Sequence, residues 1–186
     1  MTPAPNILVV LAHASLQRSR INRRLALAAA MLPNVTVHDL YDAYPDFDID
    51  IPREQSLLEA ADLVVIQHPL QWYSVPSLLK EWFDVVLEHG WAYGEGGNAL
   101  TGKSYWLVTS TGGTHETYQI EGVHQHPFSS FLPAQEQTAR LCGMTWQTPH
   151  VFHGANQADE TAVSRHIETY IKQLQTYPHW LTNNGT

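Results

Sequence analysis

Three segments of the sequence gather the side chains best suited to hold or transform a ligand. The first, residues 12–22 (AHASLQRSRIN), mixes imidazole, hydroxyl, amide and guanidinium groups and leads into a predicted helix. Free backbone N–H groups and the helix dipole favour an anion at such a point. The segment has neither the Gly-Lys-Ser/Thr of a Walker A loop nor the glycine fingerprint of dinucleotide-binding folds. It therefore predicts a phosphate or similar anion, while Ser19 could also simply cap the helix.

The second segment, residues 68–76 (HPLQWYSVP), holds two large aromatic residues between two prolines. Such a loop is stiff, and aromatic faces can stack on a flat ring or wall a planar pocket. Trp72 and Tyr73 could equally cover a hydrophobic edge of the protein. The aromatic content alone favours neither interpretation.

The third segment, residues 110–115 (STGGTH), contains paired glycines. Gly112 and Gly113 would let the backbone approach a ligand closely, or would merely form a turn. Tyr118 and His124 follow, and both can donate hydrogen bonds at neutral pH. These two residues are candidates for stabilising charge on a bound ligand.

Alternating strands and helices must position these segments. Short apolar or alternating runs predict strands at 6–11, 35–40, 63–67, 105–109 and, weakly, 149–152. Helical spacing and prolines predict helices at 20–31, 52–60, from Pro76 onward, at 131–142 and at 160–175.

This rhythm predicts an α/β fold with a five-stranded parallel sheet covered on both faces. The flavodoxin-like doubly wound arrangement, with strand order 2-1-3-4-5, fits it best. No repeat or linker interrupts the chain, so we expect a single domain over residues 1–186. In this fold ligands bind beyond the carboxyl ends of the first and third strands, where the three segments would meet.

Composition narrows the possible partners. The chain has 186 residues and a formal net charge of −8, which argues against nucleic acid as a partner. Its lone cysteine, Cys142, is expected to be a buried small residue in a protein of the reducing cytoplasm. No apolar run is long enough to span a membrane, and no histidine spacing indicates a metal site.

Four arginines lie close together at the start of the first helix, Arg18, Arg20, Arg23 and Arg24. They predict a solvated or phosphate-facing helix end.

Taken together, the segments resemble the flavodoxin-like NAD(P)H:quinone oxidoreductases, which include DT-diaphorase. The block 69–76 (PLQWYSVP), followed by Leu79-Lys80 and Trp82-Phe83, is similar to that family's flavin loop and the helix after it. Thr111-Gly112-Gly113 with Tyr118 and His124 is similar to its second flavin loop. The combined match spans roughly residues 6–177 and is weakest over 125–147.

Other residues resemble a short bacterial branch of this family. The similarity lies in residues 39–41 (DLY), 44–47 (YPDF), 49–51 (IDI) and 89–94 (HGWAYG). That branch includes the ancillary subunits of glutathione-regulated potassium efflux systems and general stress protein 14.

The resemblance implies a role for each segment. The flavin phosphate and ribityl region would be held by His13, Ser19, Ile21 and Asn22. The isoalloxazine would run along Pro69, Leu70, Gln71, Trp72 and Tyr73. Its pyrimidine edge would be approached by Thr111, Gly112 and Gly113. The catalytic hydrogen-bond donors near flavin N1 and O2 would be Tyr118 and His124. The substrate pocket would be walled by Trp72, Tyr73 and His124.

The implied activity is two-electron transfer of hydride from NAD(P)H through flavin to a quinone by a ping-pong mechanism. Donors at N1 and O2 would stabilise the negative charge that hydride leaves there. Residues 94–101 are short, and the chain lacks the longer enzymes' C-terminal extension, so FMN is favoured and FAD stays open. Relatives build the pocket across a homodimer interface, so we expect a homodimer. The bulk of His115, where some relatives carry a small residue, could narrow the pocket.

The sequence is also compatible with two other functions. The branch resemblance also implies a regulatory flavoprotein docked on a potassium efflux transporter, cytoplasmic and peripheral at the inner membrane. A one-electron flavodoxin carrier fits less well, because it would need an acidic face around an exposed flavin rather than a Trp/Tyr/His pocket.

Overall fold

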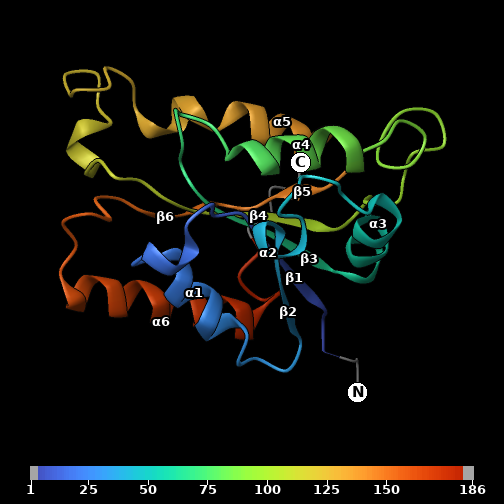
Figure 1. Cartoon of the computed structure of the whole chain (residues 1–186), viewed down its shortest axis with the longest axis horizontal. Helices are drawn as coiled ribbons and strands as arrows, with labels where there is room; N and C mark the ends of the chain where they lie inside the picture. Colours follow the sequence, from blue (N-terminus) through green and yellow to red (C-terminus); the bar gives the residue numbers. More distant parts are fainter. Residues whose placement is uncertain (1–3, 182–186) are drawn as a thin grey trace.

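A parallel sheet lies between two layers of helices in the computed structural model, which describes residues 4–181 (Figure 1). The strands are β1 (Ile7–Leu11), β2 (Val35–Asp39), β3 (Leu63–Pro69), β4 (Ser104–Ser110), β5 (Thr145–Trp146) and β6 (His150–Phe152). All the pairings are parallel, and the order is β2-β1-β3-β4-β5, with β6 also paired to β4. The predicted flavodoxin-like fold and the order of its five strands are confirmed.

Helices flank the sheet on both sides. The α-helices are α1 (Asn22–Ala29), α2 (Leu40–Ala43), α3 (Ile51–Ala60), α4 (Ser77–Val86), α5 (Pro133–Leu141) and α6 (Glu160–Thr176). Three short 3₁₀ turns are η1 (Leu16–Arg18), η2 (His115–Thr117) and η3 (Phe128–Phe131). No helix in this described part of the chain is both long and apolar enough to cross a bilayer.

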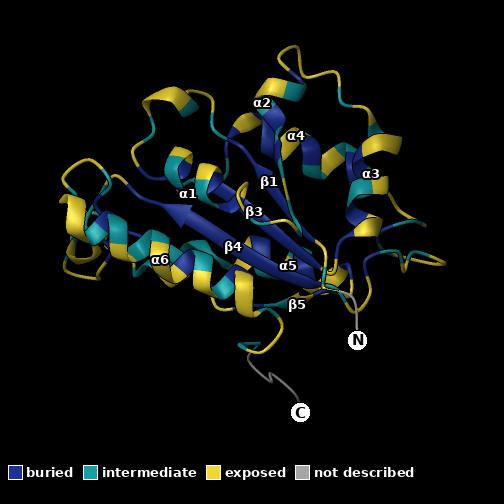
Figure 2. Ribbon diagram, turned by 90° about the horizontal axis from the view of Figure 1, so that it is seen from below, coloured by how far each residue is buried: buried dark blue, intermediate teal, exposed yellow. Residues whose placement is uncertain are grey.

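Burial on both faces explains the uninterrupted apolar runs. Along β1, Leu8 and Val10 join a core beneath α2, α3, α4 and α5, whereas Ile7 and Val9 join a core against α1 and α6. Successive side chains of a strand point to opposite faces, so a strand covered twice must be apolar at every position. Figure 2 shows the result, with buried strands at the centre and exposed residues along the outer sides of the helices.

The fifth strand differs from the sequence expectation because it is split. β6 matches the predicted weak strand and pairs with the carboxyl half of β4, but β5 was not predicted and pairs with its amino half. Between them the pairing is irregular at Pro149, which has no N–H to donate. A strand of two residues carries too little periodicity to be recognised.

Several element boundaries differ from the expected ones by one or more residues, and side-chain hydrogen bonds lie at two of them. β2 ends at Asp39 rather than at residue 40, because the Asp39 side chain accepts a hydrogen bond from the backbone of Tyr41 and caps α2. α1 begins at Asn22 rather than at residue 20, and the Ser19 hydroxyl still accepts from the Asn22 N–H, at 3.0 Å.

A buried carboxylate ties α3 to its neighbours. Glu54 is 1% exposed and accepts hydrogen bonds from the Tyr44 hydroxyl and the Trp82 indole, and it pairs with His38 at 2.8 Å. Burial acts to raise the Glu54 pKa, but the hydrogen bonds outweigh it, and the net result is a lowered pKa. The charged form of Glu54 is therefore a stabilising part of the fold.

Replacing Glu54 by Gln should lower the free energy of unfolding by about 3 kcal/mol at neutral pH, because buried partners lose their charged acceptor. A carboxyl group whose pKa is lowered in the folded state stabilises the protein at pH values above its ordinary pKa of 4.5. This stabilisation is lost as the pH falls through the lowered pKa of the folded state. Denaturant titrations should therefore show the gap between wild type and Glu54→Gln narrowing below pH 4.5. Glu59→Gln is the matched control, since Glu59 is exposed on the same helix and also accepts from an indole, that of Trp91. A gap that stays constant with pH would contradict the role of the charge.

Candidate functional site

The loops after β1, β3 and β4 meet at the carboxyl edge of the sheet, toward the left-hand end in Figure 1. A cavity of about 340 Å³ opens between them. Seven residues predicted to bind the cofactor line it, namely His13, Ser19, Ile21, Pro69, Leu70, Thr111 and Gly112. Five residues outside the predicted set also line it, namely Arg18, Arg20, Ser110, Ala155 and Asn156. The three segments singled out in the sequence thus form one site.

The β1 loop supplies positive charge and free donors. The side chains of Arg18 and Arg20 reach the cavity, and the backbone N–H groups of Arg20 and Ile21 donate to no residue that the structure describes. His13 accepts from the Ser15 N–H through Nδ1, and burial lowers its pKa, which favours the neutral ring with Nε2 as a donor. This end of the cavity is suited to a phosphate.

Asn22 lies behind the cavity wall rather than in it. Its side chain is 1% exposed and donates to the Ser110 hydroxyl at 2.9 Å, while its carbonyl accepts from Gln67. Ser110 faces the cavity and, having accepted from Asn22, keeps its own proton free to donate. Ser110 stands in the third segment singled out in the sequence, next to Thr111, so its position there could have indicated it as a site residue.

The β3 loop turns tightly at its two aromatic residues. Trp72 has φ +47° and Tyr73 has φ +63°, and Gln71 and Ser74 exchange backbone hydrogen bonds across them. Bulky residues rarely adopt this left-handed conformation, and such strain concentrates at functional sites. The N–H groups of Trp72 and Tyr73 donate to no described residue. The backbone of this turn is therefore ready to bind a ligand.

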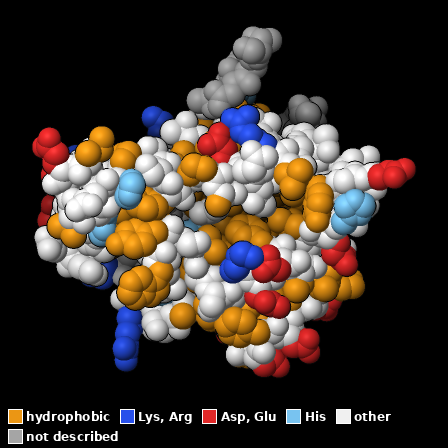
Figure 3. All heavy atoms as spheres, turned by 90° about the horizontal axis from the view of Figure 1, so that it is seen from above, with side chains coloured by type: hydrophobic (Ala, Val, Ile, Leu, Met, Phe, Trp, Pro, Cys, Tyr) orange, Lys and Arg blue, Asp and Glu red, His pale blue; other side chains and the backbone are white. Residues whose placement is uncertain are grey.

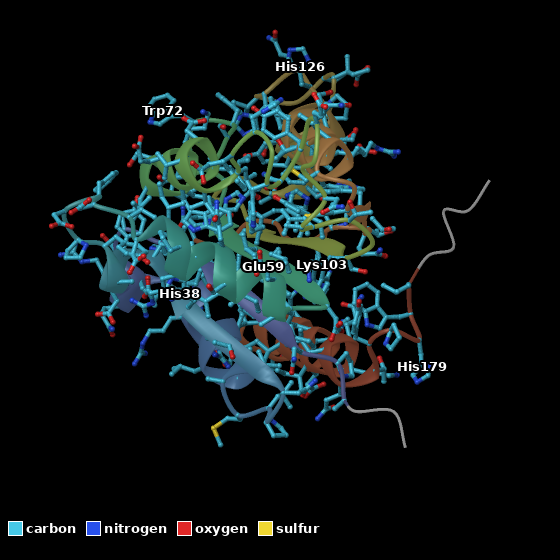
Figure 4. The ribbon with its side chains drawn as sticks, turned by 90° about the vertical axis from the view of Figure 1, so that its right-hand side faces the viewer. His38, Glu59, Trp72, Lys103, His126 and His179 are labelled. Atoms are coloured by element: carbon cyan, nitrogen blue, oxygen red, sulfur yellow. The ribbon has the colours of Figure 1, made fainter. Side chains whose placement is uncertain are left out.

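The two aromatic side chains lie differently. Trp72 is 93% exposed, and Figure 4 shows it at the rim of the molecule, pointing away. Tyr73 stacks on Phe131 with ring centres 5.1 Å apart. Trp72 therefore does not cover a hydrophobic edge of this chain, whereas Tyr73 does pack.

The β4 loop also presents backbone donors. The N–H groups of Gly112 and Gly113 donate to no described residue, whereas Thr111 uses its N–H on Phe152 and its hydroxyl on Gly113. A Cβ on Gly113 would lie 2.5 Å from the Thr117 hydroxyl oxygen. Only glycine leaves this backbone open at that position without displacing its neighbour.

The two predicted catalytic residues come together next to the cavity. The rings of Tyr118 and His124 stack at 4.2 Å, and the Tyr73 hydroxyl lies 3.3 Å from His124 Nδ1. Burial raises the Tyr118 pKa, so its hydroxyl stays protonated and able to donate at neutral pH. Phe131 and His153 complete the cluster, and no local sequence pattern indicates either of them as a site residue.

A second cavity, of about 350 Å³, lies on the α4 and α5 face. Figure 3 views this face, where hydrophobic side chains surround a hollow. Its walls include Phe83, Leu87 and Leu141, with Lys80 and Asp84 also lining it. Within residues 4–181, no three His, Cys, Asp or Glu side chains gather as a metal site.

Comparison with known proteins agrees with this geometry. A family model described as a flavodoxin-like fold matches residues 5–175. The chain is 44% identical to the glutathione-regulated potassium-efflux system ancillary protein KefG of Enterobacter sp. (strain 638), over 94% of this chain and 95% of that one.

Two solved structures add to this. General stress protein 14 of Treponema denticola, crystallised with FMN, is 35% identical, with a TM-score of 0.87 over 92% of this chain and 98% of that one. An NADPH-quinone reductase of P. pentosaceus is 30% identical, with a TM-score of 0.82 over 90% and 96%. The chain therefore belongs to the flavodoxin-like family that these ancillary, stress and quinone-reductase proteins share.

Proposed function

We propose that this protein is a single-domain, flavin-dependent NAD(P)H:quinone oxidoreductase that binds FMN in the carboxyl-edge cavity. The observation that carries the proposal is the set of uncommitted backbone donors on facing loops, those of Ile21, Trp72, Tyr73, Gly112 and Gly113. Phosphate, carbonyl and ring-nitrogen acceptors along one flavin would satisfy all of them. The FMN-bound stress protein and the quinone reductase among the relatives support the choice of ligand and activity.

Each end of the cavity suits a different part of FMN. The phosphate would lie near His13, Ser19 and the arginines, where N–H groups and positive charge converge. The ribityl chain would pass Ser110, whose hydroxyl is oriented by Asn22. We favour FMN over FAD because FMN is the flavin in the complex of the Treponema denticola relative.

The isoalloxazine would lie along the β3 loop. Pro69, Leu70 and Gln71 would flank it, and the turn N–H groups of Trp72 and Tyr73 would bond to it. Thr111 would contribute by its position only, since its N–H donates to Phe152 and its hydroxyl to Gly113.

When bound, the flavin supplies the hydride chemistry, taking two electrons from NAD(P)H and passing them to a quinone. Tyr118, His124 and the glycine N–H groups would donate hydrogen bonds where negative charge develops, which is effective in a dry site. NAD(P)H and the quinone would bind in turn at the same open face of the flavin, next to Tyr73 and His124, in a ping-pong cycle.

We further propose that the working unit is a cytoplasmic homodimer. Trp72 is 93% exposed, and Ile120 and Val123 on the β4 loop are 75% and 81% exposed. Apolar side chains exposed beside a ligand site are suited to burial by a partner copy, which would turn Trp72 into a wall of the substrate pocket.

The cofactor and activity can be tested together. The purified protein should be yellow, release FMN identified by mass, and oxidise NAD(P)H when a benzoquinone or naphthoquinone is supplied. A protein that binds no flavin after reconstitution would overturn the proposal. Bound FAD with quinone activity would overturn only the choice of cofactor.

Replacing His124 by Ala should slow flavin reduction by NAD(P)H about 100-fold while flavin affinity stays near that of the wild type, because one donor to the developing charge is lost. Stopped-flow absorbance measures the reductive half-reaction, and fluorescence titration measures affinity. His126→Ala is the control, since His126 is an exposed histidine of the same loop. An unchanged reduction rate in His124→Ala would exclude the catalytic role.

A regulatory role is the second candidate. The 44% identity to an ancillary protein of a potassium efflux system favours a subunit docked on such a transporter at the inner membrane, with flavin as a structural or sensing ligand. Co-purification with the transporter's soluble domain, and a change of ion efflux on adding this protein, would support it. Quinone turnover without any such association would support the enzyme role and exclude the regulatory one.

A further inference from the structure

A buried histidine stands immediately before the aromatic loop and has no part in the proposed chemistry. His68 is fully buried at the end of β3, and its ring Nδ1 lies 2.9 Å from the carbonyl oxygen of Pro69. Its Nε2 lies 3.3 Å from the side-chain nitrogen of Gln135 on α5. The oxygen of Gln135 in turn lies 2.9 Å from the hydroxyl of Tyr105 on β4. Gln135 and Tyr105 are 7% and 3% exposed, so little of this chain of contacts is open to solvent.

Only one arrangement of protons satisfies every member of this chain. A carbonyl can only accept, so the proton of His68 must lie on Nδ1, and Nε2 must then accept. Gln135 therefore presents its NH₂ to His68 and its oxygen to Tyr105, whose hydroxyl donates. The opposite tautomer would set two lone pairs against each other at Nδ1 and the Pro69 oxygen. The direction of each bond follows from one backbone carbonyl.

The chain is neutral throughout. Burial lowers the pKa of His68, and hydrogen bonds to Pro69 and Gln135 oppose the shift without reversing it. Tyr105 ends the chain of contacts, and Cys142 after α5 interacts with Tyr105; burial raises the pKa of each, which keeps both uncharged. No charged side chain of the described residues faces the imidazole.

The same segment of the chain also fixes the tip of the loop. Just before Gln135, Phe131 in η3 stacks on Tyr73, so residues 131–135 hold the loop near its base and at its turn. The base has a second tie, from the Leu70 N–H to the Ser110 carbonyl at 2.8 Å. The strained turn at Trp72 and Tyr73 therefore rests on a buried polar support.

We propose that His68, set in the Nδ1–H tautomer by the Pro69 carbonyl and held in place by Gln135 and Tyr105, is a positioning residue that fixes this carbonyl and thereby aims the loop's free N–H groups at the flavin. The inference rests on the proposed function for its ligand. The tautomer and the hydrogen-bond chain themselves do not depend on any ligand.

The tautomer is measurable directly. Long-range ¹H–¹⁵N spectra of ¹⁵N-histidine-labelled protein should show His68 with a protonated Nδ1 and a bare Nε2, unchanged from about pH 5.5 to about pH 8.5, where an ordinary imidazole titrates. His68→Asn identifies the signal. A protonated Nε2, or titration within this range, would overturn the inference even if the protein binds flavin well.

Two substitutions at Gln135 test the effect on the loop. Gln135→Leu leaves the imidazole Nε2 without a donor, so the dissociation constant for FMN should rise about tenfold at every pH, relative to wild type. In Gln135→Glu a protonated His68 could donate to both Glu and Pro69, whereas a neutral ring could serve only one. FMN affinity of Gln135→Glu should therefore be near that of the wild type at about pH 5.5 and weaken about tenfold by about pH 8.5.

The controls separate positioning from general damage. Gln137→Leu changes an exposed glutamine of the same helix and should leave FMN affinity unchanged. Wild type is titrated at each pH, since the FMN phosphate itself titrates. If Gln135→Leu fails to fold, the pH series of Gln135→Glu carries the test alone. The positioning role would be refuted if the FMN affinity of Gln135→Glu did not change with pH, or if a folded Gln135→Leu bound FMN as tightly as the wild type. A wild type that binds no flavin would instead refute the proposed function and leave the tautomer measurement standing.

Discussion

The parallel pairing of β1, β3 and β4 is the constraint on which the rest of the structure depends. These strands lie side by side, with Leu11 opposite Gln67 and Gln67 opposite Val108, so they end together at one edge. Within the sheet β1 and β3 each have a hydrogen-bonded strand on both sides. Beyond the last pairs no strand lies alongside, and several loop N–H groups, those of Ile21, Trp72, Tyr73, Gly112 and Gly113, donate to no residue that the structure describes. The binding capacity of the site follows from where the sheet stops.

Buried polar contacts behind the walls make this edge rigid. The amide of Asn22 orients Ser110, and the imidazole of His68 bonds to the carbonyl of Pro69. Asn22 and His68 are 1% and 0% exposed, so breaking either contact would leave a buried polar group without its partner, at a cost above that of a surface bond. The loops themselves carry few apolar anchors, and Tyr73 is held mainly through Phe131. Polar residues of the core thus hold the loops in place, as apolar packing holds the sheet.

The sequence predicts the parts of this architecture that local patterns encode. Strand β1 was predicted because it is covered on both faces and is apolar at every position, and the order of loops along the chain then located the site. The left-handed turn at Trp72 and Tyr73 was not predictable, since neither residue type favours positive φ and the turn is held by contacts from residue 131. The place of Asn22 behind Ser110 was missed for a related reason. Which side of a wall a side chain occupies depends on a partner 88 residues away.

The turn at Trp72 and Tyr73 has a consequence for the abundance of the protein in the cell. Two aromatic residues at positive φ, with unbonded N–H groups, make this turn one of the least favourable local conformations of the chain. A ligand that bonds to these N–H groups binds the native state and not the unfolded chain, so it raises the melting temperature by mass action. Protein made faster than its ligand is supplied would populate opened loops and be exposed to proteases. With the proposed flavin as that ligand, the strain in this one turn would couple the lifetime of the polypeptide to the supply of flavin.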